Sequence, residues 1–550
     1  MNLKLHLVSS LVKVFPDEEP RAFDGRVEGF LNENVSFQAA WIEQDPAFTK
    51  CIARIRVESP IAAYVRVRRV RYVPVLFPTF ADADDNYLRK TPGLYPDPLT
   101  DELDNITNIF SNHWEAAWFD IDCGEEIPSG VYPIDVILED FYSGAEIARI
   151  RAEYTRLNAR LPEQKLIHTK WFHTDGLARW YRTEMFSEDF WEIVKNYIRA
   201  FRKRSMNMLL TPIHTPPLDT RIGGERTTCQ LVDVEVVEEG VYKFGFEKFE
   251  RWIKTALELG VEYFEMAHLF TQWGAKCAPK IMAKVNGEEK QIFGWDNGAT
   301  SEEYLGFLDQ YLPAIVKKID EMGIRERCIF HISDEPNKSF VDNYMVARKA
   351  VSKHLEGFAI VDALSDIELY KSGAVQTPIP GNNHIKPFIE AGVENLWTYY
   401  CVSQYKDVSN TFVAMPSQRT RIIGVQMFKY DIVGFLQWGF NHYNSQLSMY
   451  PINPYLSTDA DGFSPAGDCF QVYPGEGGQP IESIRMLTMA EAMQDLRAMN
   501  LLSSLKGKDF VMNLIEDGIE PIEFDRYPKD AKYLLNLRKR INLEIMKAIG

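Results

Sequence analysis

The chain has 550 residues, a length at which two or three domains are expected rather than a single core. Its composition, 45% hydrophobic and 25% charged, is that of a folded globular protein and excludes a disordered chain. The net charge of −17 argues against a nucleic-acid partner, because binding phosphates requires a basic surface.

Three further features of the sequence indicate where the protein is located in the cell. No segment approaches the ~18 apolar residues of a membrane span, so no membrane association is expected. The seven cysteines have neither CxxC nor CxxH spacing, which favours a reducing compartment over disulfides or structural zinc. Residues 1–20 lack the apolar run of a signal peptide, so we expect a cytoplasmic protein; the sequence leaves open a homo-oligomer.

Residues 1–160 predict an N-terminal domain with an antiparallel β-sandwich. Short runs rich in β-branched and aromatic residues alternate with clusters of Pro, Gly, Asn and Asp. Residues 87–104, which contain three prolines, predict a long loop. The strands are expected at residues 35–42, 51–57, 61–75, 114–121 and 130–138.

Residues 161–505 change to a repeating pattern of strand, loop and helix, which predicts a (β/α)8 TIM-like barrel. A doubly wound sheet is the alternative, but no glycine-rich phosphate loop follows any strand. The strands are expected at residues 165–173, 207–214, 261–269, 328–334, 358–363, 375–379, 394–401 and 434–440. The helices are expected at residues 188–203, 247–259, 301–322, 340–355, 384–391, 418–430 and 481–502.

Four segments stand outside this repeat. A hairpin is predicted within residues 227–246, and an Asn-Gly turn at 286–287 predicts a second one. Residues 443–480 are too long for an inert connection and are expected to lie over the active face. Residues 506–550 predict a C-terminal helical tail that packs on the barrel or the sandwich, with a helix at 531–549.

Two adjacent acids, Asp334 and Glu335, stand where the fourth barrel strand is expected to end. Pro336 prevents the strand from continuing, so both acids lie at its carboxyl end. In a (β/α)8 barrel this end of the strands forms the active site. Adjacent like charges are costly to bury unless they are used. We therefore interpret Asp334 and Glu335 as the catalytic pair of a glycosidase.

Other polar and aromatic residues at the predicted strand ends suit a sugar pocket, in which flat rings pack against pyranose faces. Core packing is an equally good explanation for Trp397 and Trp438. No two histidines have ligand spacing, so His268 is expected in the pocket wall, and neither a metal nor a cofactor is expected. The predicted substrate-binding residues are His173, Asp175, His214, His268, Trp273, Trp397, Tyr399, Trp438 and Asn441.

Neighbouring acids favour one mechanism over another. An enzymic nucleophile must stand about 5 Å from the acid/base, across the sugar, which two neighbours on one strand do not easily do. They suit substrate-assisted catalysis, with Glu335 as general acid/base and Asp334 orienting a 2-acetamido group. A sugar without that group, attacked by Glu265 or Asp362, is the alternative. A catalytically silent carbohydrate-binding protein is the third hypothesis.

Four motifs together resemble glycoside hydrolase family 123: Ser-Asp-Glu-Pro at 333–336, Lys-Trp-Phe-His-Thr-Asp at 170–175, Leu-Trp-Thr-Tyr-Tyr at 396–400 and Gly-Phe-Leu-Gln-Trp-Gly-Phe-Asn at 434–441. The resemblance implies a sandwich followed by a barrel. It also implies β-N-acetylgalactosaminidase activity with retention through the substrate acetamido group. Our first hypothesis is therefore an exo-acting enzyme whose substrate has a terminal β-linked N-acetylhexosamine. The family's Asp-Glu pair corresponds to Asp334 and Glu335. The preference for GalNAc over GlcNAc depends on this resemblance alone.

Overall fold

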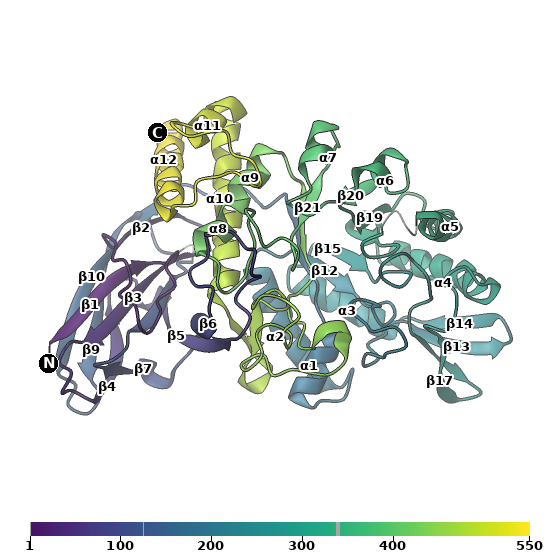
Figure 1. Ribbon diagram of the computed structural model, residues 1–550, viewed down its shortest axis with the longest axis horizontal. Helices are drawn as coiled ribbons and strands as arrows, with labels where there is room; N and C mark the ends of the chain where they lie inside the picture. The colour runs from purple at the N-terminus through teal and green to yellow at the C-terminus, as the bar shows by residue number, and fades with distance from the viewer. Residues whose placement is uncertain (1, 125, 337–340) are drawn as a thin grey trace.

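The computed structural model describes residues 2–124, 126–336 and 341–550. The N-terminal sheets, purple to blue in Figure 1, form one end of the molecule, and the parallel strands of the second part lie toward the other. None of the helices in these ranges is long and apolar enough to cross a membrane.

The N-terminal part contains two five-stranded sheets that enclose a common core. Their strands are β1 (Leu3–Ser9), β2 (Arg26–Phe30), β3 (Val35–Glu43), β4 (Lys50–Glu58), β5 (Val65–Val75), β6 (Gly93–Thr100), β7 (Ile106–Phe110), β8 (Glu115–Ile121), β9 (Gly130–Asp140) and β10 (Glu146–Leu157). The orders are β1-β3-β8-β5-β6 and β2-β10-β9-β4-β7, antiparallel except that β2 runs parallel to β10. Phe37, Ile55 and Ile134, from three of these strands, are buried in the core.

The predicted loop at residues 87–104 is wrong, because β6 forms within it. This strand lies at the edge of its sheet, where it pairs with β5 and forms one isolated bridge, between Pro98 and Ser483. An edge strand tolerates prolines such as Pro96 and Pro98, since an amide on its open side needs no partner.

The second part is a nearly closed barrel of eight parallel strands, which confirms the fold prediction at this level. The strands are β11 (Ile167–Lys170), β12 (Met208–Thr211), β15 (Tyr263–Met266), β18 (Cys328–Phe330), β19 (Ala359–Ala363), β20 (Thr377–Ile379), β21 (Trp397–Tyr399) and β22 (Gly434–Gln437). They follow one another around the sheet from β11 to β20, and β21 and β22 complete the ring beside β11. A bridge between Gly381 and Tyr399 joins the two edges.

Helices connect and cover the barrel strands. They are α1 (Thr174–Tyr181), α2 (Glu188–Lys203), α3 (Glu247–Glu258), α4 (Glu302–Glu321), α5 (Val341–Ser352), α6 (Ile367–Lys371), α7 (Lys386–Glu390), α8 (Ser417–Arg421), α9 (Ile423–Lys429), α10 (Ile484–Lys506), α11 (Lys508–Ile515) and α12 (Ala531–Ile549). Ser187 and Ser301 cap α2 and α4 by accepting a hydrogen bond from the backbone N–H three residues on. The helix predicted at 418–430 is divided at Ile422, and residue 340, the first of another predicted helix, lies outside the described residues.

The two insertions join into one four-stranded sheet. It is made of β13 (Asp233–Glu238), β14 (Val241–Gly245), β16 (Ile281–Val285) and β17 (Glu288–Phe293), in the order β14-β13-β16-β17. Asn286 and Gly287 have φ of 54° and 86°, as a tight hairpin turn of type I′ requires. The pairing of β13 with β16 joins hairpins from different loops, which neither segment indicates by itself.

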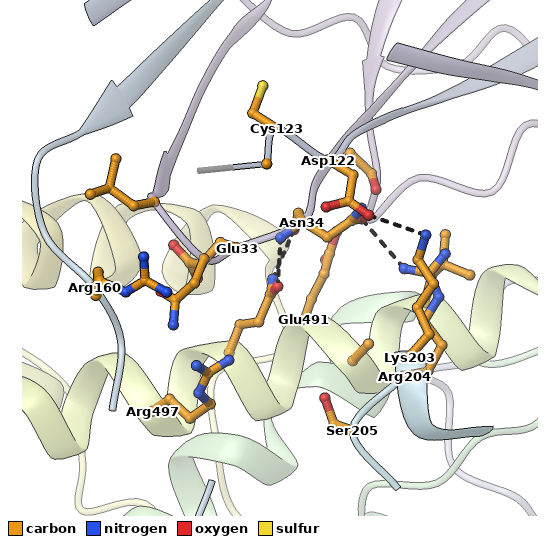
Figure 2. A pocket seen from close by; sticks show the side chains of 17 residues that line it. Glu33, Asn34, Asp122, Cys123, Arg160, Lys203, Arg204, Ser205, Glu491 and Arg497 are labelled. Carbon is orange, nitrogen blue, oxygen red and sulfur yellow. Dashed lines mark hydrogen bonds and ion pairs between the residues drawn. The ribbon is translucent and has the colours of Figure 1, made fainter. Parts of the chain in front are cut away.

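A cavity of about 310 Å³ lies where the N-terminal sheets meet the barrel. Figure 2 shows Lys203 and Arg204, from the end of α2, reaching toward Asp122 and Asn34. Ser205, in the same lining, comes just before β12. The cavity therefore lies at the amino ends of the barrel strands, away from the ends where a barrel places its chemistry.

Candidate active site

Asp334 and Glu335 follow β18 at the carboxyl end of the barrel, and both are half-buried. The Tyr399 hydroxyl, at the end of β21, donates a 2.8 Å hydrogen bond to Oε1 of Glu335. The Trp273 amide donates a 2.9 Å bond to the Asp334 carbonyl. The ends of β18, β15 and β21 thus hold the pair. The two side chains are neither fully exposed to solvent nor enclosed by helices.

The backbone around the pair is strained. Glu335, Trp273 and Asp219 have φ of 45°, 60° and 39°. These residues lie in the loops that follow β18, β15 and β12, three neighbouring strands of the barrel. Residues other than glycine rarely adopt this left-handed conformation, and such strain concentrates at functional sites.

The Asp334 carboxyl has a pKa well above its usual range, first because of burial and then because of the negative charge of Glu335. Asp362 and Asp219 act in the same direction, and His331 opposes them. Asp334 therefore holds a proton more readily than an ordinary aspartate, as is typical of an acid placed for chemistry.

Glu265 and Asp362 lie deeper in the barrel, fully buried. Glu265 accepts hydrogen bonds from the Thr169 hydroxyl, from the Trp171 indole at 3.2 Å and from His331 Nε2 at 3.1 Å. Asp362 accepts bonds from the Ile332 amide at 3.0 Å and from the Tyr344 hydroxyl. Both carboxylates are thus engaged and enclosed, which argues against either as a nucleophile.

One set of potential metal ligands in the described part of the chain adjoins these acids. The donor atoms of His268, His331 and Asp362 all lie within 4.8 Å of one another. The two imidazole rings, however, stack with centroids 4.3 Å apart at 19°. A metal lies in the plane of each imidazole that binds it, and stacked, nearly parallel rings share no such position. The arrangement does not suit a metal ion.

His331 instead lies between two carboxylates. Burial would lower its pKa, but Asp362 and Glu265 outweigh burial and raise it to about 9. His268, which stacks on it, has a pKa well below the usual range because of burial and the neighbouring His331. The stack therefore pairs one charged ring with one neutral ring at neutral pH.

Trp438 lies on the opposite side of the barrel mouth, half-exposed after β22, and its indole N–H donates to Oδ2 of Asp468 at 2.9 Å. Its carbonyl lies 2.9 Å from Nε2 of His173. Arg226 donates to Nδ1 of His173 at 3.0 Å and pairs with both oxygens of Asp175 at 2.6 and 3.1 Å. Burial, followed by Arg226, lowers the pKa of His173 to about 4, so this ring is neutral.

The predicted substrate-binding residues divide by exposure. Trp273 is 42% exposed and Trp438 is half-buried, while Tyr399 is buried but bonded to Glu335. Trp397 packs inside the barrel, where a Cβ on Gly434 would lie 2.0 Å from its indole, so core packing explains it. The remaining five are enclosed and support the wall from behind; they are His173, Asp175, His214, His268 and Asn441. Contact with a sugar stays a prediction for the whole set.

The enclosed residues have identifiable partners. Asn441 clamps the His173 backbone, accepting from its amide at 2.8 Å and donating to its carbonyl at 2.9 Å. His214 Nε2 lies 2.8 Å from the His268 carbonyl. These bonds join neighbouring strand ends.

Sequence reasoning missed several polar residues at the barrel mouth, which are Asp219, Arg226, His331, His442 and Asp468. His331 carried a weak signal, since it lies in the strand that ends at the acids. Asp468 carried none, because only folding of residues 443–480 brings it to Trp438. Those residues do reach the active face, where the Leu447 amide donates to Asp219 at 3.2 Å.

Comparison with known proteins finds one matching family model and a similar solved structure. The family model described as "Glycoside hydrolase 123, catalytic domain" matches residues 171–502. A solved family 123 glycoside hydrolase from Clostridium perfringens is 14% identical, with a TM-score of 0.74 over 99% of this chain and 98% of that one. At this identity the likeness shows the fold alone.

Other solved structures match only weakly, with TM-scores near 0.3. A Bacteroides uniformis β-glucuronidase, 8% identical, aligns with 85% of this chain and 48% of its own at a TM-score of 0.30. A Ruminococcus gnavus β-glucuronidase, also 8% identical, aligns with 89% of this chain and 68% of its own at 0.31. A search of curated proteins finds no match.

Proposed function

The chain belongs to glycoside hydrolase family 123 and is a glycoside hydrolase, and we propose that it is a retaining, exo-acting β-N-acetylgalactosaminidase that uses the 2-acetamido group of its substrate as nucleophile. The observation that carries this proposal is the position of Asp334 beside Glu335 at the end of one strand.

The placement of the other carboxylates supports it. A retaining enzyme with its own nucleophile needs a second carboxylate facing the acid/base across the sugar. Glu265 and Asp362, the candidates for that role, are fully buried and hydrogen-bonded by neighbouring strands. A nucleophile supplied by the substrate removes this requirement.

The roles follow from charge. Asp334 holds a proton readily in the free enzyme because burial and Glu335 oppose its ionisation. A substrate acetamido N–H that donates to Asp334 favours the carboxylate form of Asp334. The proton that Asp334 releases passes to Glu335, which then acts as general acid. The Asp334 carboxylate also offsets the positive charge that develops on the oxazolinium-like intermediate. Tyr399 holds Glu335 in place through its 2.8 Å hydrogen bond.

The substrate proposed is a glycan with a terminal β-linked N-acetylhexosamine. Trp273, next to Asp334, and Trp438, across the barrel mouth, present aromatic surface, as packing against a pyranose face requires. The Clostridium perfringens relative is described by its glycolipid glycan hydrolysis, which supports a glycan substrate here. A cytoplasmic location is likewise proposed, and the seven unpaired cysteines support it.

A panel of aryl β-glycosides of GalNAc, GlcNAc, Gal and Glc tests the proposal. We expect cleavage of the acetamido sugars, GalNAc first, and tight binding of a thiazoline analogue of the oxazoline. A covalent adduct with a 2-fluoro glycoside would instead indicate an enzymic nucleophile. Stoichiometric sugar binding without release of the aryl group would indicate a silent binding protein.

A further inference from the structure

We propose that His331 is a positioning residue of this active site: placed between Glu265 and Asp362, it fixes the end of β18 and provides the positive charge that faces Asp334. The inference rests on the roles proposed above for Asp334 and Glu335. It adds a residue that acts on the reaction only through the acid pair.

The contacts of His331 reach both neighbouring strands. Nε2 lies 3.1 Å from Glu265 on β15, and Nδ1 lies 3.7 Å from Asp362 on β19. The ring is fully enclosed, and Asp334 follows three residues later. Nδ1 makes no hydrogen bond within the part of the chain that the structure describes, but a carboxylate close to each ring nitrogen favours the imidazolium over the neutral ring.

The segment between His331 and the acids is fixed as well. The Ile332 amide donates to Asp362 at 3.0 Å, and the Ser333 hydroxyl donates to the Thr271 carbonyl at 2.8 Å. The amides of Leu269 and Phe270 donate to the carbonyls of His331 and Ile332. Moving the His331 ring would disturb the strand end that aims Asp334.

The ring of His331 is surrounded by carboxylates and uncharged aromatic rings. Glu265 on β15, Asp362 on β19 and Asp334 on its own strand end are the carboxylates that act with it. His268 stacks on the ring as a neutral imidazole, and the indole of Trp171, just after β11, meets it edge-on with ring centroids 6.3 Å apart. The network buries two carboxylates and one cation beneath a pair of acids.

The remaining charges near the mouth do not replace His331. Glu335 and Asp219 are both acidic and oppose ionisation of Asp334. Arg226, also buried, is committed to Asp175. His331 therefore favours the carboxylate form of Asp334, which is the form that accepts the acetamido N–H.

The test substitutes His331 and follows kcat, KM and the pH profile. His331→Gln keeps a donor toward Glu265 without the charge. We expect kcat on an aryl β-N-acetylhexosaminide to fall ~10–100-fold, less than for loss of a group that contacts the transition state directly. Losing a neighbouring positive charge raises the pKa of Asp334, so the acid limb of kcat/KM should move up by ~1 pH unit.

His168→Gln is the matched control. His168 is a fully buried histidine of the same barrel, bonded to the Ser205 carbonyl at 3.2 Å and lying against Phe435. Its loss should lower thermal stability as His331→Gln does but leave the acid limb in place. A structural role for His331 would make the two variants behave alike, and that result would overturn the proposal.

Glu265→Gln keeps the test decisive where His331→Gln fails to fold. Histidine ring ¹⁵N signals of the wild type should include one imidazolium that persists above pH 8, and Glu265→Gln should lower the pH at which it titrates. Absence of such a signal would overturn the inference. If Glu335→Gln keeps wild-type activity, the proposed function fails instead, so the two failures are distinguishable.

Discussion

Two of the regions in which the molecule buries carboxylates surround them in opposite ways. Between the N-terminal sheets and the barrel, Glu482 accepts hydrogen bonds from Arg204 at 2.6 and 2.7 Å and from Arg68 at 2.7 Å. Asp495 accepts bonds from Arg421 at 2.6 and 2.9 Å and from Arg538 at 2.9 Å. Burial would raise the pKa of both acids, but these guanidinium groups hold it below the usual range.

At the barrel mouth Asp175 is paired with Arg226, but no guanidinium of the described residues donates to the carboxyl of Asp219, Asp334 or Asp468. Burial raises the pKa of Asp219 to about 6 and that of Asp468 to about 7. Burial also raises the pKa of Asp334 well above its usual range, and the negative charge of Glu335 adds to the effect. Glu482 and Asp495 are thus held in the charged form, whereas Asp219, Asp334 and Asp468 are shifted toward the neutral form.

The difference separates assembly from chemistry. A buried acid with guanidinium partners stays charged, and removing one partner leaves an uncompensated charge that destabilises the fold. A buried acid without such partners exchanges a proton near neutral pH, which a general acid needs. Substitutions in the two regions should therefore have effects of different kinds.

Glu335→Gln should have the largest effect on activity. A general acid contributes ~10²–10⁴-fold, and the loss should be greatest for substrates with poor leaving groups, which need protonation most. Thermal unfolding should change little. Steady-state kinetics with a good and a poor leaving group measures the effect, and near wild-type turnover on both would contradict the proposed role.

Glu482→Gln should do the reverse. It leaves Arg68 and Arg204 without their shared carboxylate, so the free energy of unfolding should fall by ~3–5 kcal/mol while kcat per folded molecule stays unchanged. The pKa of Glu482 is lowered in the folded state, so its contribution is full at neutral pH and is lost as pH falls through acidic values. Urea unfolding at pH 7 and pH 4 checks this.

A loss of kcat in the folded Glu482→Gln protein would break the proposed division, because it would couple this contact to the barrel mouth. Glu523→Gln is a suitable control, since Glu523 pairs with Lys386 at the surface, where an ion pair contributes little.

Asp334→Asn should lower activity and raise stability together. The loss of kcat should be ~10²–10³-fold, as for removal of a preorganised group facing developing charge. The folded pKa of Asp334 is raised, so ionisation at neutral pH costs stability, and that cost grows as pH rises above the unfolded value. The variant should therefore melt higher than wild type at pH 7 and equally at pH 3. A lower melting temperature at pH 7 would show that Asp334 is paired as Glu482 is.

The sequence predicted the framework because its signals are local. All eight barrel strands formed where short apolar runs ended in polar residues, and α2 has the predicted bounds of Glu188–Lys203. The edge strand β6 was hidden by its prolines, which central strands exclude. Local rules of this kind place elements but do not report which edge a strand occupies.

The site was predictable only where its residues are neighbours in sequence. Asp334 and Glu335 were predicted as the catalytic pair from their adjacency and from Pro336, and the structure places both at the barrel mouth. The contacts that set their charge join residues far apart, as with Glu265 and His331, 66 positions away, and no periodicity encodes such a pair. Closure of the barrel creates these contacts, so the chemistry of the pair emerges from packing.

Asp468→Asn should have the smallest effect, and its pH dependence sharpens the comparison. Asp468 accepts the Trp438 indole N–H at 2.9 Å, and its pKa of about 7 means that it is neutral below that pH. A charged acceptor is worth about 1 kcal/mol more than a neutral one, so kcat/KM should fall ~5-fold above pH 7 and match wild type below it. Stability should change the other way, because asparagine avoids burying a carboxylate above pH 7. If the variant and the wild type have equal kcat/KM at pH 6 but differ at pH 8, Asp468 belongs with the acids of the mouth that exchange a proton near neutral pH. If kcat/KM of the variant is lower by the same factor at both pH values, Asp468 behaves like the paired acids Glu482 and Asp495.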